Sequence, residues 1–355
     1  MSRRRHLISK RWSRRLAGAF YCGAILSAAP AFAEAEGQPG NVFEAIQKDI
    51  LAVFEKCQNA IVKIEAVDSH GRLSGTGFFI DPIGTLFTSY TVGGESRDIV
   101  VRFGGKQYPA TRVVSDLRSG VSILKIDAQT PFLTFGHSRD LPLAAPVIAI
   151  GYPMDMALTP AFGTVSGFDR KYMGRYFATA HLRVNIAVQR GEGGAPLLNP
   201  QGEVLGILIS RLDSGTASFV LPIEAAEKVR KDFLRFHEVR PGWLGLHVKD
   251  VAGAENESTA CVEEITCDAP GQKAGFQVGD RVLQIGDRKI SSTEDLIDAS
   301  FFLTADDSVD VQILRKGAPV QLTVQPCEPP NPARTQTLGT GIPTNFQVPA
   351  LQIGK

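Results

Sequence analysis

Apolar residues follow helical spacing in two segments that flank a long stretch of short, β-rich runs. The two segments are Val42–Cys57 and Ile223–Phe236, and each predicts an amphipathic helix. Between them, runs rich in β-branched and aromatic residues are separated by Gly, Pro and Asp, which predicts antiparallel barrels or a sandwich. The predicted strands are Ile61–Ala66, Gly77–Ile80, Thr85–Thr88, Ile99–Phe103, Val121–Ile126, Pro146–Ile150, Gly163–Val165, Val184–Val188 and Val204–Ile209.

A second, smaller module follows, at residues 241–327. Its pattern predicts short strands and two helices, with a final strand pair before Cys327. The residues after it, 328–355, contain five prolines and little charge, which is typical of a disordered tail. The helices are expected at Ala269–Ala274 and Ser292–Phe302, and the strand pair at Val309–Arg315 and Pro319–Val324.

The first 33 residues have the features of an export signal. A basic stretch ends at Arg15, an apolar run follows from Leu16 to Ala29, and Ala31–Ala33 has the small-x-small pattern of a cleavage site. The run is too short for a membrane anchor, which needs about 20 apolar residues. We expect cleavage after Ala33, an exported or periplasmic mature protein and a linker over residues 34–41, with general or twin-arginine export both open.

Charge and cysteine content exclude several classes of function. Residues 1–33 hold seven of the 38 basic residues and no acidic one, so the rest carries 31 basic against 37 acidic residues, a net charge of −6. That balance gives no reason to expect nucleic-acid binding. The spacing of the remaining cysteines suggests neither zinc nor a redox pair, so no metal or cofactor is expected. Disulfide pairing and simple burial both remain open for these residues: Cys57, Cys261, Cys267 and Cys327.

Five segments in order resemble motifs of the HtrA/Deg family of trypsin-like serine proteases with a C-terminal PDZ domain. They are Gly75–Thr88, Ala149–Pro153, Gly163–Gly167, Gly191–Asn199 and Gly202–Ile207. The resemblance covers roughly residues 42–327. It implies a mainly β fold, with a trypsin-like double antiparallel β-barrel over 42–238 followed by a PDZ domain over 241–327. It also implies a trimer and a role in envelope protein quality control.

The sequence departs from that family at all three catalytic positions. Laid on the motifs, Thr91 stands where the histidine belongs, Gly120 where the aspartate belongs and Gly193 where the serine belongs. Hydrolysis by such a triad needs a hydroxyl nucleophile, an imidazole base and an orienting carboxylate. We therefore expect no catalytic residue and interpret the barrel domain as a pseudoprotease.

Neighbouring residues do not replace the triad in the sequence. Asp116, Ser89, Ser119 and Glu192 lie close to the lost positions, but none supplies an imidazole. The five histidines beyond residue 33 all fall outside the histidine motif: His70, His137, His181, His237 and His247. A relocated triad stays possible in principle, because triads are defined by geometry.

Backbone N–H groups do not depend on which side chains a loop carries. The amides of Gly191 and Gly193 correspond to the oxyanion loop, so the cleft is expected either to hold an extended segment without cutting it or to be collapsed scaffold.

The second module carries a peptide-binding signature. Trp243–Leu246 resembles the PDZ carboxylate-binding loop, and Asp268–Ile290 resembles the PDZ segment that follows it. A Φ-Gly-Φ turn exposes backbone N–H groups to a terminal carboxylate, and the next strand offers an edge for β-augmentation. The resemblance implies binding through Trp243, Leu244, Gly245 and Leu246, with Leu244 and Leu246 around the last ligand side chain. An intramolecular contact to the barrel is the competing interpretation.

Three functions follow from these features. The first is a holdase, adaptor or regulator that binds polypeptide C-termini or unfolded proteins, as a homotrimer or with active relatives. The second is a serine endopeptidase with a non-standard site. The third is a scaffold that binds nothing.

Overall fold

The computed structural model describes residues 42–169, 178–211, 217–252 and 258–330. The predicted signal peptide and linker, and the tail beyond residue 330, lie outside these ranges. Helix α1 (Val42–Cys57) opens the described chain and buries Val53 and Cys57. Phe43 of its predicted apolar stripe is 80% exposed. A short 3₁₀ turn, Gln58–Ala60, leads from α1 into the first sheet.

The first sheet has seven antiparallel strands in the order β5-β4-β1-β2-β3-β7-β6. One turn of helix, α2 (Tyr90–Gly93), follows β3 and contacts β7. The strands are β1 (Ile61–Asp68), β2 (Gly71–Phe79), β3 (Thr85–Ser89), β4 (Arg97–Phe103), β5 (Lys106–Pro109), β6 (Thr111–Asp116) and β7 (Val121–Lys125).

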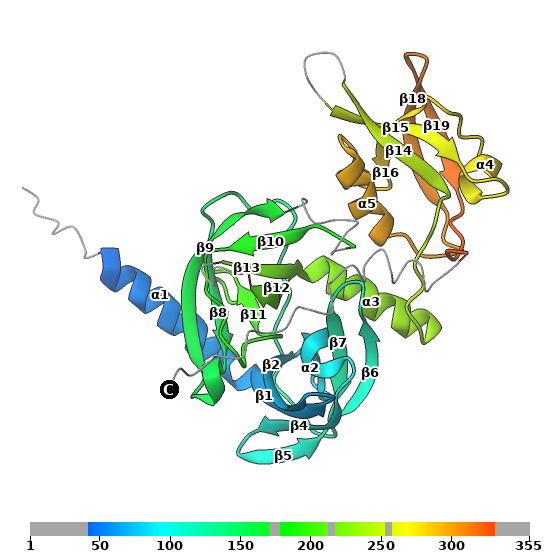
Figure 1. Ribbon diagram of the computed structural model, residues 1–355. Coiled ribbons are helices and arrows are strands. Elements are labelled where there is room, and N and C mark those ends of the chain that lie inside the picture. Colours follow the sequence, from blue (N-terminus) through cyan, green and yellow to red (C-terminus); the bar gives the residue numbers. More distant parts are fainter. Residues whose placement is uncertain (1–41, 170–177, 212–216, 253–257, 331–355) are drawn as a thin grey trace, which may run out of the picture. The chain divides into compact units, whose positions relative to one another are not determined.

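Six strands form a closed barrel in the order β10-β13-β12-β11-β8-β9, shown in green in Figure 1. Helix α3 (Ile223–Phe236) follows the last strand and ends at His237, whose φ of 61° is left-handed. The strands are β8 (Pro146–Gly151), β9 (Thr159–Asp169), β10 (His181–Val184), β11 (Pro196–Leu198), β12 (Val204–Arg211) and β13 (Ser218–Pro222).

The C-terminal sheet has the order β14-β15-β16-β18-β19, with β17 paired to β16, so β14 is an edge strand. Helix α5 (Thr293–Phe301) contacts β14 and β15, and the short helix α4 (Pro270–Lys273) contacts β19. The strands are β14 (Leu246–Ala252), β15 (Ser258–Ile265), β16 (Arg281–Ile285), β17 (Arg288–Lys289), β18 (Val309–Arg315) and β19 (Ala318–Val324).

One apolar cluster connects the two N-terminal sheets. It includes Phe87 of β3, Ile150 of β8, Val229 of α3 and Phe301 of α5, all buried. Because burial of each such side chain contributes about 1.5–3 kcal/mol, this shared core fixes the sheets and α3 together. The residues around Gly193 discussed below lie on strands β2 and β3, on helix α2 and on the loop before β11.

The fold class is confirmed, and helices α1 and α3 have the predicted bounds. The predicted strand Val184–Val188 is wrong, because the strand is His181–Val184. After Val184 the Oδ1 atom of Asn185 accepts from the Thr164 amide, and Ser218 bonds both Ile186 and Val188. In residues 185–188, hydrogen bonds to side chains thus take the place of backbone bonds between strands. Strands β5, β6, β11 and β13 and helix α2 were not predicted.

Candidate functional site

The structure brings Thr91 and Gly193 together. A Cβ atom built on Gly193 would have as its nearest neighbours Ser89 Oγ at 3.3 Å, Val92 Cγ2 at 3.7 Å and Thr91 Oγ1 at 3.8 Å. Ser89 ends β3 and Thr91 lies in α2, so the strand-to-helix turn points both hydroxyls at Gly193. Two hydroxyls at 2.9 Å from each other form this side of the cleft.

Gly120 lies behind that turn. The Tyr90 amide donates to the Gly120 carbonyl at 2.6 Å, and Asp116 accepts from the amides of Arg118 and Ser119. Gly120 has a φ of +82°, and a Cβ there would approach the Ile209 side chain at 3.1 Å. Left-handed backbone of this kind favours glycine. The conformation at position 120 is therefore favourable for glycine and unfavourable for a residue with a carboxylate side chain.

Among the described residues, the three atoms nearest to a Cβ built on Gly193 belong to Ser89, Val92 and Thr91, and none of them is an imidazole atom. His181 is fully buried on β10, where its Nδ1 atom contacts the Thr179 carbonyl at 2.9 Å. Burial lowers its pKa to about 4. The other described histidines are exposed: His70, His137, His237 and His247.

Thr76 of β2 fixes the loop that carries Gly191 and Gly193. Its amide donates to the Gly193 carbonyl at 2.9 Å, and its hydroxyl donates to the Gly191 carbonyl at 2.8 Å. The same hydroxyl accepts from the Tyr152 amide at 3.1 Å. A buried threonine of the first sheet thus holds the loop of the second in one position.

The amides of Gly191, which is buried, and of Gly193, which is partly exposed, share one feature. The carbonyls of the peptide bonds that precede them accept from the amides of Met154 and Ala195, at 2.6 and 2.9 Å. Both bonds are trans, so each N–H points away from its bonded carbonyl. In the described part of the chain neither N–H has a protein partner. Unpaired, oriented donors of this kind can bind a carbonyl oxygen.

Glu192 is the only carboxylate carried by that loop. Burial raises its pKa, and its Oε2 atom accepts from the Gln189 amide at 2.6 Å. Its Cγ atom lies 3.2 Å from the Cβ position of Gly151. This carboxylate therefore holds its own loop through the Gln189 amide.

Trp243–Leu246 forms the loop before edge strand β14. The Leu244 carbonyl accepts from the Gly271 amide at 2.8 Å and the Gly245 carbonyl from Thr266 at 2.9 Å, whereas the amides of Leu244 and Gly245 bond no described group. Gly245 has a φ of +73°, and a Cβ there would lie 2.2 Å from Ala269 Cβ. The Leu244 and Gly245 amides are thus the two donors of this loop without a described partner, whereas the Trp243 amide bonds to the Cys327 carbonyl at 2.8 Å.

The two leucines of this loop differ in their environment. Leu244 is 5% exposed and packs in the core of the C-terminal sheet, whereas Leu246 is half-buried and lies against Gly271. Leu246 is therefore the more exposed of the two leucines. Asp250 of β14 accepts from the Thr293 amide at 2.8 Å, which holds the start of α5 beside this strand.

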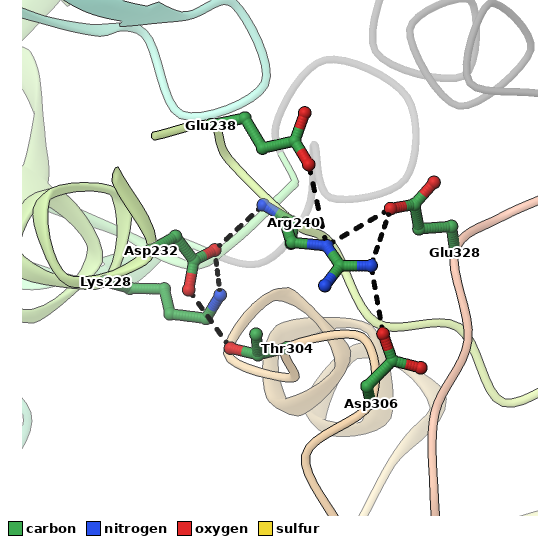
Figure 2. Close-up of polar contacts among 7 residues, drawn as sticks. All are labelled: Lys228, Asp232, Glu238, Arg240, Thr304, Asp306 and Glu328. Atoms are coloured by element: carbon green, nitrogen blue, oxygen red, sulfur yellow. Dashed lines mark hydrogen bonds and ion pairs between the residues drawn. The ribbon is translucent and has the colours of Figure 1, made fainter. Parts of the chain in front are cut away.

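A polar junction that the sequence did not predict connects α3 to the C-terminal sheet. Asp232 is 2% exposed and accepts from Lys228 at 2.5 Å, from the Arg240 amide at 3.2 Å and from the Thr304 hydroxyl at 3.1 Å. Figure 2 shows the Arg240 guanidinium among three further carboxylates: Glu238, Asp306 and Glu328.

The described residues hold no cluster of three His, Cys, Asp or Glu side chains suited to a metal. The four described cysteines are free thiols; Cys57 is buried, Cys267 is exposed, and Cys261 and Cys327 are intermediate. Burial raises the pKa of the Cys57 thiol. Among the same residues no helix is long and apolar enough to cross a membrane.

Comparison with protein families assigns both halves of the described chain. Residues 75–207 match the trypsin-like peptidase domain and residues 242–325 match the PDZ domain. The first match contains Thr91, Gly120 and Gly193, and the second contains the loop Trp243–Leu246. The two candidate sites therefore lie in separate, recognised domains.

Curated relatives include a probable periplasmic serine endoprotease DegP-like from Pseudomonas fluorescens, 32% identical over 265 residues, covering 70% of this chain and 56% of that protein. The corresponding protein of Halomonas elongata is 29% identical over 266 residues, covering 71% of this chain and 56% of that protein. The chain thus spans little more than half the length of these relatives.

Solved structures share the fold. An HtrA-type protease AlgW with tripeptide has a TM-score of 0.67 at 23% identity, covering 80% of this chain and 98% of that chain. The serine endoprotease from Yersinia pestis has a TM-score of 0.58, also at 23% identity, covering 79% and 98%.

Proposed function

The chain carries the trypsin-like peptidase and PDZ domains of the HtrA/DegP family, and on that premise we propose that it is a pseudoprotease that binds polypeptide without cutting it. The ligand is a C-terminus or an extended segment, held through the PDZ domain. The protein acts as a holdase, an adaptor or a regulator in envelope protein quality control. Export to the periplasm and assembly into trimers, alone or with active relatives, belong to the same proposal.

The observation that supports this proposal most strongly is the set of side chains next to Gly193. Two hydroxyls, Ser89 and Thr91, face a glycine, and no imidazole lies among the nearest atoms. A hydroxyl without a base is not a nucleophile near neutral pH. Backbone donors alone retain only about 10³–10⁴-fold catalysis over water, which is far too little for useful peptide hydrolysis.

The PDZ loop supports binding independently. The amides of Leu244 and Gly245 have no described partner, and β14 is an edge strand. A terminal carboxylate would accept from the loop while the peptide extends the sheet.

A serine endopeptidase with a non-standard site is the second candidate, because the printed names of the curated relatives are those of endoproteases. Such an enzyme needs a reactive hydroxyl. Ser89 is the hydroxyl closest to the vacant side-chain position of Gly193, so it is the residue that this candidate would use.

A fluorophosphonate probe separates the two candidates. We expect no covalent adduct and no cleavage of quenched, denatured casein by the purified protein. A Gly191→Val variant serves as the contamination control, since its Cβ would lie 2.3 Å from the Tyr152 carbonyl oxygen and disrupt the loop. An adduct on Ser89, or turnover that Gly191→Val abolishes, would establish the endopeptidase instead.

The PDZ part of the proposal has its own test. A peptide with a free C-terminal carboxylate should bind more tightly than its amidated form, and Gly245→Val should remove that difference. Equal affinity for the free and the amidated peptide would show that the loop does not bind a terminal carboxylate.

A further inference from the structure

A pocket of about 430 Å³ lies between two tight turns of the PDZ domain. One turn, Gln277–Asp280, precedes β16, and the other, Arg315–Gly317, joins β18 to β19 (Figure 1). Its lining shares no residue with the carboxylate-binding loop Trp243–Leu246. The pocket is therefore separate from the peptide site proposed above.

A buried ion pair makes the pocket rigid. The Asp280 carboxylate is 1% exposed and receives two hydrogen bonds of 2.8 Å from the Arg315 guanidinium and one of 2.8 Å from the Gln277 amide. Arg315 also donates to the Gly275 carbonyl at 2.8 Å. Each charge of this pair neutralises the other, so the pair joins the two turns without adding net charge.

The residue after each partner carries a positive charge that pairs with no described carboxylate. Arg281 follows Asp280 and Lys316 follows Arg315, and both line the pocket. In the part of the chain that the structure describes, neither side chain makes a hydrogen bond or an ion pair. Asp280 is the only acidic residue of the lining. Two uncompensated positive charges therefore face one rigid cavity.

The rim of the pocket adds an apolar contact. Val278 is 69% exposed at the tip of the first turn. A phosphate ion would not use this side chain, and a nucleic acid would meet the net charge of −6 on residues 34–355. A polypeptide segment with acidic and apolar side chains uses both features.

We propose that this pocket is a second binding site of the PDZ domain, for the acidic side chains of a polypeptide partner. Carboxylates pair with Arg281 and Lys316, while an adjacent apolar side chain packs on Val278. The site does not depend on the state of the catalytic cleft. It lets the domain select ligands by charge as well as by their C-terminus.

Fluorescence anisotropy with the complete chain tests the proposal. The probe is a short, labelled peptide of Glu, Leu and Ser with an amidated C-terminus, so that the carboxylate-binding loop has no terminal carboxylate to bind. The pocket variant is Arg281→Gln with Lys316→Asn, because Asn tolerates the left-handed φ of 50° at position 316. The control, Lys273→Gln with Lys289→Gln, removes the same net charge from exposed lysines outside the pocket.

We expect the pocket variant to weaken binding about tenfold, which corresponds to two charge pairs of moderate strength, and the control to change it less than about twofold. Added salt should weaken the wild-type complex. Lys316→Asn alone, at an exposed turn, should give an intermediate loss and guards against misfolding of the double variant.

Three results would overturn the proposal. They are absence of acidic-peptide binding, equal losses in the pocket and control variants, and binding of inorganic phosphate at the pocket without binding of the peptide. Cleavage of casein would overturn the proposed pseudoprotease function but leave this site untouched, so the two failures are distinguishable.

Discussion

The loop around Gly193 and the α3–PDZ junction are held by different kinds of contact. At the loop, the amide and the hydroxyl of Thr76 both bond to backbone carbonyls, those of Gly193 and Gly191. At the junction, side chains make the contacts, with the buried Asp232 at the centre (Figure 2). Replacing side chains of the loop itself therefore leaves these carbonyl bonds in place, whereas a single replacement at the junction can remove a side chain that makes three contacts.

Asp232→Ala is the most damaging change that this comparison predicts. It leaves the Lys228 ammonium, 11% exposed, and the Thr304 hydroxyl buried without their acceptor. Breaking a buried pair in this way costs about 3–5 kcal/mol. Urea unfolding followed by fluorescence measures the loss. The control is Glu263→Ala, whose partner Lys249 is solvent-exposed, and an equal effect of both changes would refute the contrast.

Acid should weaken the fold next most strongly, through His181. Burial lowers its pKa to about 4 from an ordinary 6.5, so the unfolded chain takes up a proton first. The stability is present above pH 6.5 and is lost as the pH falls from there toward 4. At pH 4.5 the loss is about 2–3 kcal/mol.

The urea midpoint at pH 7 and at pH 4.5 measures this loss. His181→Gln should make the midpoint less dependent on pH in that window, although the variant is less stable at pH 7. An unchanged pH dependence in the variant would exclude His181 as the cause.

Two adjacent glycines, Gly193 and Gly194, differ in the space that a Cβ atom would have. Gly194 has a φ of +88°, and a Cβ there would lie 2.3 Å from both the Thr76 carbonyl oxygen and Thr88 Oγ1, whereas the nearest atom to a Cβ on Gly193 is at 3.3 Å. Gly194→Ala should cost about 2 kcal/mol or more through strain and displacement of the loop. Gly193→Ala should cost less than about 1 kcal/mol.

Thermal unfolding of the two variants tests this expectation. Equal costs would mean that the backbone requires glycine at both positions. The expected difference means that position 193 accepts a small side chain, whereas position 194 does not.

Sequence patterns predicted the parts of this protein that depend on local order. The helices α1 and α3 were found because their apolar residues repeat at 3.6-residue spacing, and the two domains because their glycine-rich turn motifs stand in a recognisable order. Strands β5 (Lys106–Pro109) and β6 (Thr111–Asp116) were missed because they are polar and partly exposed, so they show no apolar alternation.

The α3–PDZ junction could not be predicted from the sequence for a different reason. Asp232 and Lys228 are four residues apart, which in a sequence resembles an exposed pair on a helix. The burial of Asp232 depends on its partner Thr304, which lies 72 residues further along the chain. A charge pattern alone cannot identify such a partner, whereas Gly193 was identified because it interrupts a recognisable motif.

Arg240→Gln should have the smallest effect, because its guanidinium contacts Asp306, Glu328 and Glu238 near the surface. Surface pairs contribute little to global stability, so the urea midpoint should stay almost unchanged. Locally, the Arg240 carbonyl still accepts from the Ala305 amide at 3.3 Å, but the loop at Asp306 loses its charge partner. Hydrogen exchange should therefore accelerate at residues 304–307 and not at α3, and acceleration along α3 would show that Arg240, rather than Asp232, carries the junction.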